Sequence, residues 1–493
     1  MNTKYIWLLL VFIGFTACNT DETVIIIEDV PLTSGSADFS SFVALGASFT
    51  AGFSDGALFI ASQENSFPNI LSEQFANIGG GDLSQPLMND NIGGLLFGGV
   101  QIQEPRLIFD GTGPVRLDAD PTTEVTNILA GPFNNMGVPG AKSFHLLAPG
   151  YGNVAGVPTG QANPYFARMA SNPNATMLGD AVVQNPTFFT LSEIGGNDVL
   201  SYALSGGLGV DQTGNFDPST YGSTDITDPT VLGGTISLIV DGLTANGAMG
   251  VIANVPYVTS LPYFTTVPYN PVPLDAANAA ALNAAYTAYN DGLLQAEALG
   301  FITASEREAR TIVFVEGQNA VVIEDEDLTD LSALGLPSYR QTTPDDLMVL
   351  PGASFIGTLV DNNPLLINGL SVPLTDQWVL TFIETGSVIT ATDAYNVAIE
   401  GIASSKGLAF VDLKALLEQA STTGITFDDF TMTTDLVLGG LVSLDGVHLT
   451  ARGYALMANM FLEAIDATYG SNFHEAGVVA RADDYVVSYP EFL

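Results

Sequence analysis

Short apolar runs alternate with helical stretches along most of this 493-residue chain, and this alternation constrains the fold more than any other feature. Runs typical of buried strands begin at Phe42 and occupy 188–194, 249–255, 311–315, 320–323 and 408–412. Helical patterns occupy 66–75, 236–243, 274–298, 392–404 and, behind a capping Thr450, 450–467. Strands that alternate with helices build a parallel sheet covered on both faces. We therefore expect an α/β protein.

Polar side chains follow two of these predicted strands. The strand that begins at Phe42 leads into a Gly/Ser turn with Ser48, and 188–194 leads into a glycine-rich turn with Asn197. Open α/β sheets place their sites at the carboxyl ends of the strands. Ser48 is therefore a candidate nucleophile, and the Asn197 amide is a candidate donor to an oxyanion.

A base for such a nucleophile stands near the end of the chain. His448 is one of three histidines and follows an acid, Asp445, by three residues, just before the last predicted helix. A carboxylate at this spacing can hold one imidazole nitrogen and leave the other free to accept a proton.

Four short blocks occur in a fixed order: Gly46-Ala47-Ser48, then 135–140, then Gly195-Gly196-Asn197-Asp198, then Asp445-Gly446-Val447-His448. At these blocks the chain resembles the SGNH, or GDSL-type, hydrolases. Each block alone is a common pattern, whereas the ordered set is specific to that family. The resemblance extends over most of residues 40–470. It implies a three-layer α/β/α, flavodoxin-like parallel sheet with large insertions.

The resemblance also implies a mechanism and the residues that perform it. Ser48 would attack an acyl carbon, His448 would take its proton, and Asp445 would orient His448. The oxyanion would meet the N–H groups of Ser48 and Gly140 and the amide of Asn197. This predicts a carboxylic ester hydrolase of the lipase or esterase type, with no metal and no cofactor. The ester itself, whether lipid, carbohydrate or thioester, is left open.

Two alternatives remain open. Taken singly, Ser48 and Asn197 are ordinary turn or capping residues, and Asp445 with His448 can be a capped helix start. Ala47 stands where the family usually has an acid, which removes a polar anchor from the Ser48 turn. This departure and the insertions support a second hypothesis, a non-catalytic surface lipoprotein that uses the same fold to bind a lipid or a partner.

The other two histidines, His145 and His474, lie outside the four blocks. We expect His145 on a helix and His474 in a C-terminal loop, and we expect both to be structural.

The N-terminus predicts export. A short basic start and about eleven apolar residues suit a signal peptide over 1–17, and Cys18, the only cysteine, follows it directly. This arrangement resembles the lipobox of bacterial lipoproteins, which implies lipidation of Cys18 and a tether over 18–36. The acidic stretch 19–22 resembles the surface-export signal of Bacteroidetes lipoproteins. We therefore expect a lipid-anchored protein of the cell envelope, in the outer membrane and exposed at the surface; the alternative is a secreted protein with a free thiol.

Composition restricts the partners. Twelve Lys+Arg against 53 Asp+Glu give a formal charge of −41, while 47% of the residues are hydrophobic. Such a chain can bury a large core. The acidic excess argues against nucleic acid as a partner and against electrostatic docking on anionic lipid. The expected partners are a small-molecule or lipid ester and, through the acyl anchor, a membrane.

Residues 37–493 are predicted to form one monomeric hydrolase domain with insertions at about 79–131 and 328–385. Apolar and aromatic residues such as 262–264 suit a pocket for an acyl chain or an aromatic alcohol, or they pack the insertions. The acidic run 324–327 suggests either a calcium site or a solvated loop.

Overall fold

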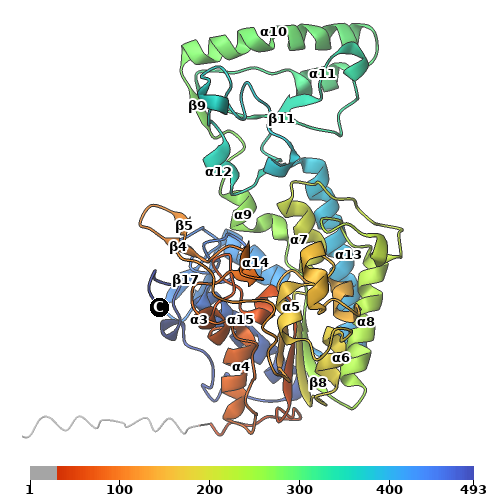
Figure 1. The fold of residues 1–493 in the computed structure, drawn as a ribbon, viewed down its shortest axis with the longest axis vertical. Coiled ribbons are helices and arrows are strands. Elements are labelled where there is room, and N and C mark those ends of the chain that lie inside the picture. Colours follow the sequence, from red (N-terminus) through yellow and green to blue (C-terminus); the bar gives the residue numbers. More distant parts are fainter. Residues whose placement is uncertain (1–29) are drawn as a thin grey trace, which may run out of the picture. The chain divides into compact units, whose positions relative to one another are not determined.

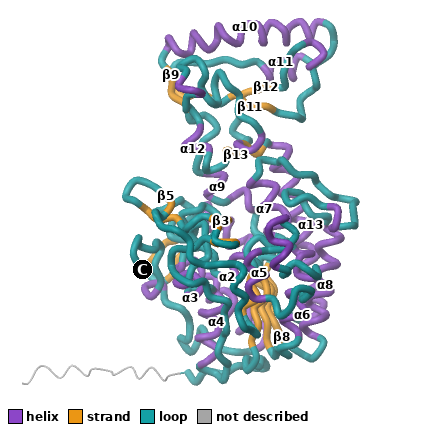
Figure 2. The backbone as a smooth tube through the Cα atoms, viewed as in Figure 1, coloured by secondary structure: helices purple, strands orange, loops and turns teal. Residues whose placement is uncertain are grey.

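A computed structural model describes residues 30–493 and contains a five-stranded parallel sheet in the order β15-β8-β7-β1-β6 (Figures 1 and 2). The predicted signal peptide, Cys18 and most of the predicted tether lie outside the described residues. The strands are β1 Phe42–Gly46, β6 Asn135–Gly137, β7 Phe188–Ser192, β8 Met249–Ala253 and β15 Ala409–Val411. The prediction of a parallel sheet is confirmed. Strand β6 was not predicted, because its three residues contain no apolar run.

Helices cover both faces of this sheet, as expected from the alternation. Val43 and Leu45 belong to one core with α6, α7, α8 and α13, whereas Phe42 and Ala44 belong to a second core with α4, α14 and α15. Figure 2 shows the strands between α4 on one side and α6 and α8 on the other. The bounds of these helices are α4 Phe67–Ala76, α6 Met177–Val182, α7 Gly196–Leu204, α8 Pro229–Thr244, α13 Phe382–Lys406, α14 Leu413–Thr422 and α15 Ala451–Tyr469.

Capping residues explain where two of these helices begin. The Thr450 hydroxyl accepts the N–H of Gly453 at 2.9 Å and starts α15 where predicted. Helix α13 begins at Phe382, well before the predicted start at 392 and inside the predicted insertion 328–385. The cause is a capping box in which Glu384 Oε2 accepts the N–H of Thr381 at 2.6 Å.

Residues 79–131 contain two small hairpins. Strands β2 Leu95–Phe97 and β3 Val100–Gln103 pair with each other, as do β4 Leu107–Phe109 and β5 Pro114–Arg116.

The residues between α9 (Pro262–Thr265) and α13 have an apolar core of their own, built on α10 (Ala276–Ala298), with Ile302 and Ile312 on either side of α11 (Ala304–Arg310). Figure 1 shows α10, α11, β9 and β11 gathered together. The remaining elements here are β9 Val272–Leu274, β10 Gly317–Asn319, β11 Val322–Glu324, β12 Tyr339–Gln341, β13 Leu347–Met348, α12 Gly352–Phe355 and β14 Val379–Leu380. A short hairpin, β16 Ile425–Phe427 with β17 Phe430–Met432, precedes α15.

The predicted strand at 311–315 is wrong, because side chains satisfy its backbone groups. Asn290 and Asn283, both on α10, accept the N–H groups of Ile312 and Phe314 at 3.0 and 2.8 Å, and their amides donate to the carbonyls of the same two residues at 2.9 Å. The segment therefore runs along a helix and not along another strand. The neighbouring prediction, 320–323, overlaps β11.

In the acidic run 324–327, three acids are exposed as in a solvated loop, whereas Asp325 is buried and forms an ion pair with Arg340. Within residues 30–493, no group of three or more His, Cys, Asp or Glu side chains is arranged to hold a metal ion. None of the helices described in that range is long and apolar enough to cross a membrane.

Candidate active site

Ser48 is the first residue of α2 (Ser48–Ala51), which begins directly after β1. Gly46 leaves room for this turn, because a Cβ on it would lie 2.0 Å from Thr50 Oγ1. Ser48 is 7% exposed, and its hydroxyl has no hydrogen-bond partner among the described residues. As the first residue of a helix, Ser48 also lacks an intrahelical partner for its N–H. Both groups are available to another molecule.

Asp445 and His448 form the predicted pair. Their Oδ2 and Nδ1 atoms lie 2.8 Å apart. The carboxylate also accepts the N–H groups of Val447 and His448 at 2.9 Å each, the N–H of Gly56 at 2.8 Å and the hydroxyl of Ser443 at 3.1 Å. Burial acts to raise the pKa of Asp445, but the His448 imidazole and these hydrogen bonds outweigh it and hold that pKa well below its usual value. An ionised Asp445 fixes Nδ1 as the protonated nitrogen, which leaves Nε2 free to act as a base.

The loop after α2 joins the serine turn to the histidine turn. The N–H of Phe53 donates to the carbonyl of Ser48 at 2.9 Å, and the Phe53 ring lies 4.5 Å from the His448 ring. One residue further, the Ser54 hydroxyl donates to the carbonyl of Leu449 at 3.0 Å. The fold therefore brings together two segments that are about 400 residues apart in the chain. Within residues 30–493, no hydrogen bond joins Ser48 to His448 directly, and catalytic hydrogen bonds are often long before substrate binds.

The two remaining oxyanion candidates follow the strands on either side of β1. Gly140 comes after β6, is exposed and has φ +78°, and Asn197 lies in the first turn of α7, directly after β7. The Asn197 amide donates to the carbonyl of Ala141 at 3.0 Å, which connects these two loops. Ser48, Gly140 and Asn197 thus follow three adjacent strands at the same edge of the sheet.

Asp198, the acid next to Asn197, has a structural partner. It is buried and accepts the N–H and the hydroxyl of Ser143 at 2.8 and 2.7 Å. Burial raises its pKa above the usual value. Asp198 therefore fixes the segment that follows Gly140 against α7.

Glu193 belongs to the site but was missed in the sequence. It has φ +49°, and its buried carboxylate accepts the N–H of Ala47 at 2.6 Å and the N–H of Thr50 at 2.9 Å, and also the Thr50 hydroxyl at 3.2 Å. Burial raises the pKa of Glu193 to about 7, against the opposing effect of these hydrogen bonds. The signal in the sequence was an acid inside an otherwise buried run, because such a charge is rarely placed there without a partner.

Asp55 was missed as well. It is buried, its Oδ1 accepts the N–H of Leu444 at 3.0 Å, and its own N–H donates to Ser443 Oγ at 3.0 Å. Burial raises its pKa to about 7, and the charge of the nearby Asp445 acts in the same direction. Asp55 therefore fixes the turn that carries Asp445.

The other two histidines have partners of their own. His145 lies on a short 3-10 helix, Ser143–Leu147, and its ring stacks on Tyr151 at 4.2 Å. His474 lies in a C-terminal turn, where its Nδ1 is 3.3 Å from Asp466 Oδ2.

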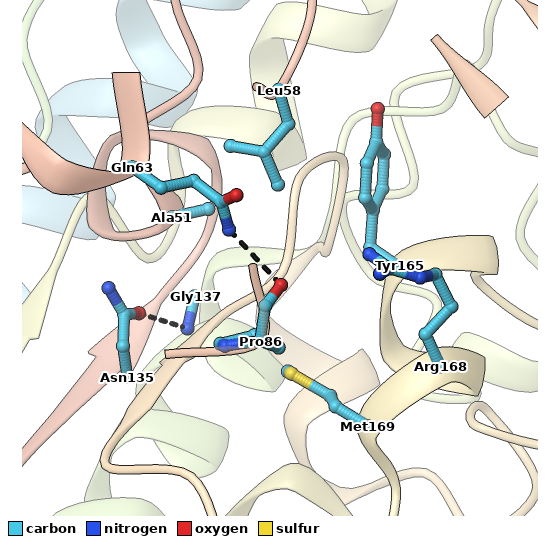
Figure 3. A pocket seen from close by; sticks show the side chains of 9 residues that line it. All are labelled: Ala51, Leu58, Gln63, Pro86, Asn135, Gly137, Tyr165, Arg168 and Met169. Atoms are coloured by element: carbon cyan, nitrogen blue, oxygen red, sulfur yellow. Dashed lines mark hydrogen bonds between the residues drawn. The ribbon is translucent and has the colours of Figure 1, made fainter. Parts of the chain in front are cut away.

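A small pocket lies under the serine turn, between Ala51, Gly137 and the side chains of Tyr165 and Met169 (Figure 3). The Gln63 amide donates to the carbonyl of Pro86 at 3.1 Å at its edge. Its volume of about 10 Å³ holds about one water molecule, so a substrate does not fit there.

No protein-family model, no curated protein and no solved structure matches this chain.

Proposed function

We propose that this protein is a serine hydrolase that cleaves carboxylic esters, with a fold of the three-layer, flavodoxin-like SGNH type. The observation that carries the proposal is the Asp445–His448 pair, 2.8 Å apart, held against the turn that displays the unpartnered Ser48 hydroxyl. A nucleophile, a base and an orienting acid in this order are what acyl transfer requires.

Each side chain has one task in this mechanism. His448 Nε2 takes the Ser48 proton as the hydroxyl oxygen attacks the acyl carbon, and then returns that proton to the leaving alcohol. Asp445 holds the imidazole and stabilises its charged form. The N–H groups of Ser48 and Gly140 and the amide of Asn197 donate to the oxyanion. Water then attacks the acyl-enzyme with His448 again acting as the base, which releases the acid and restores Ser48.

The test is hydrolysis of a series of chromogenic esters of increasing acyl length by the wild type and by Ser48→Ala. The hydroxyl is one small group at a turn, so we expect the variant to keep its circular dichroism spectrum and to lose turnover completely. Wild-type turnover in a folded Ser48→Ala protein would refute the assignment of the nucleophile.

A second function is favoured by the low exposure of Ser48 and by Ala47, which carries no acid. It is a non-catalytic surface protein that uses the same fold to bind a lipid or a partner. A wild type that hydrolyses none of the esters but binds their acid or alcohol products would support this second function.

Attachment to the cell envelope is proposed from Cys18 and the residues before it. Several acyl chains on one cysteine hold a protein firmly to a membrane, whereas a single chain does not. We expect Cys18→Ser to leave the protein unprocessed or released, as checked by metabolic labelling with a fatty acid and by fractionation. A wild type that is unlabelled and soluble outside the cell would exclude the anchor.

A further inference from the structure

A large pocket lies beside the Gly140 loop. It has a volume of about 760 Å³, within the range of small-molecule sites. Its lining includes two pairs of aromatic rings: the Phe144 and Tyr221 rings meet edge to face at 5.7 Å, and the His145 ring stacks on Tyr151 at 4.2 Å.

Apart from Lys142, the polar side chains that line this pocket are neutral. The Lys142 ammonium group is buried and donates to the carbonyl of Asp225 at 2.6 Å, so a backbone group of the protein already binds its charge. Burial, followed by the nearby Lys142 charge, lowers the pKa of His145 to about 4. Its Nδ1 accepts the N–H of Lys142 at 3.0 Å, so the ring hydrogen lies on Nε2, which has no hydrogen-bond partner among the described residues. His145 is thus a neutral N–H donor in an aromatic pocket.

The pocket is adjacent to the oxyanion loop. Asn163 lines the pocket and donates to the carbonyl of Pro139 at 2.8 Å, and Asn197 donates to the carbonyl of Ala141. The segment 139–142, which includes Gly140, therefore contacts both the pocket and the proposed oxyanion site.

We infer that this pocket binds the neutral aromatic alcohol part of the ester, with its ring packed against Phe144, Tyr221 and Tyr151 and with His145 Nε2 donating to an oxygen of the ligand. This inference rests on the proposed function only in calling the ligand a substrate. An anionic ligand is disfavoured, because the Lys142 ammonium group is already engaged by the carbonyl of Asp225 and the chain carries a formal charge of −41.

Calorimetry with the Ser48→Ala protein tests binding without turnover, and 2-naphthol serves as the probe. We expect 2-naphthol to bind, Tyr221→Ala in the same background to weaken it about tenfold, and Phe216→Ala, which removes an exposed ring, to leave it unchanged. We expect His145→Phe, which keeps a ring but removes the N–H, to weaken 2-naphthol and to spare naphthalene.

Equal affinity in the Tyr221→Ala protein, or tighter binding of the anion 2-naphthoate than of 2-naphthol, would overturn the assignment of the pocket. If the wild type binds 2-naphthol at Tyr221 but does not hydrolyse 2-naphthyl acetate, the proposed hydrolase function would be refuted, whereas the assignment of the pocket as a binding site would stand.

A second inference comes from Glu193, whose carboxylate lies behind the Ser48 turn. It accepts one N–H on each side of Ser48, from Ala47 and from Thr50. A Cβ at Gly46 would lie 2.9 Å from Glu193 Oε1, so only glycine at that position leaves room for this approach. The backbone of Glu193 is in the left-handed region, which non-glycine residues adopt only when the surroundings require it.

We propose that Glu193 is a positioning residue for Ser48 and supplies, from the end of the neighbouring strand, the acid that position 47 lacks. The role is positional, because the carboxylate contacts only the backbone and the Thr50 hydroxyl of the turn. This inference rests on the proposed function. A shift of the serine oxygen by about 1 Å is enough to lower turnover about 10²-fold.

The test compares Glu193→Ala, Glu193→Gln and a matched control, Glu384→Ala, at a temperature well below the Tm of each protein. Glu384 is an equally buried glutamate that accepts a backbone N–H, but it lies in the capping box of α13. We expect Glu193→Ala to lower kcat and the rate of fluorophosphonate labelling about 10²-fold with KM nearly unchanged, and Glu193→Gln, which keeps an acceptor, to recover most of the loss. Glu384→Ala should lower only the Tm.

Unchanged kcat and labelling in a folded Glu193→Ala protein would overturn the positioning role and leave the proposed function intact. A wild type that neither labels nor hydrolyses would contradict both.

Discussion

Two turns carry the proposed catalytic groups, and they are stabilised in different ways. The turn with His448 contains its own acid, since Asp445 accepts the N–H groups of the two residues that end the tetrad and also holds the imidazole. The turn with Ser48 contains no acid and depends on Glu193, which lies about 145 residues further along the chain.

The pKa values of the carboxyl groups that stabilise the two turns are shifted in opposite directions. Asp445 faces an imidazole, and its pKa lies well below the usual value although it is buried. Burial of Glu193 raises its pKa to about 7, because backbone N–H groups alone do not compensate for the lost water. A carboxylate beside a partner that can become cationic thus stays ionised, whereas one that meets only amides and a hydroxyl does not remain fully so at neutral pH.

The largest expected effect comes from removing the Asp445 carboxylate from the turn that carries His448. Asp445→Asn should lower kcat by about 10³–10⁴-fold, because a carboxamide holds the imidazole in the wrong tautomer and does not stabilise its charged form. Steady-state kinetics on a short chromogenic ester measures the loss, with His474→Ala as the control that keeps activity. A loss below tenfold in Asp445→Asn would mean that His448 is oriented by some other group.

A smaller effect is expected at the loop that connects β7 to α7. Asn197→Ala should lower kcat about 10²–10³-fold, as for one oxyanion donor, with a smaller change in KM. The same kinetic assay separates the two parameters. A variant that loses affinity but keeps turnover would place Asn197 in substrate recognition instead.

The smallest expected effect is on the pH dependence of stability, to which the carboxyl groups that stabilise the two turns contribute in opposite directions. Glu193 has an ordinary pKa of 4.5 and a folded one of about 7, so its contribution to stability is present below the ordinary value and is lost as pH rises through 7. Asp445, whose folded pKa is depressed, contributes in the opposite sense: its stabilisation is present above its ordinary pKa of 3.8 and is lost as pH falls further.

We therefore expect the Tm to be highest near about pH 5 and to fall by a few degrees toward pH 8 and also below pH 4. Differential scanning calorimetry across this range measures it. Glu193→Gln should make the fall of the Tm between pH 5 and pH 8 less steep. Part of the fall should remain, because the pKa values of Asp55 and Glu384 are also raised to about 7. If the Tm falls equally steeply above pH 5 in the wild type and in Glu193→Gln, the general repulsion of a strongly acidic chain, and not Glu193, causes the fall.

The contrast between the turns also explains what the sequence could reveal. Asp445 and His448 are three residues apart, and strands such as β1 and β7 are apolar runs, so local patterns predicted both the pair and the parallel sheet. Glu193 and Asp55 act on residues far away in the chain, and no local pattern specifies such a contact. Strand β6 was missed because three residues are too few to form a pattern.

The region between α9 and α13 also contains a contact that local sequence patterns do not predict. The run 311–315 looks like a strand by composition, but Asn283 and Asn290 bond its backbone from α10. Side chains that replace a neighbouring strand as hydrogen-bond partners can be recognised only when the two segments are seen together.

The most direct test of the central claim is to treat the purified protein with a fluorophosphonate, digest it and locate the adduct by mass spectrometry. We predict a single adduct on Ser48 that becomes undetectable in His448→Asn and forms at the wild-type rate in His474→Ala. No adduct on the folded wild type, or an adduct at another residue that forms equally fast in His448→Asn, would contradict the account.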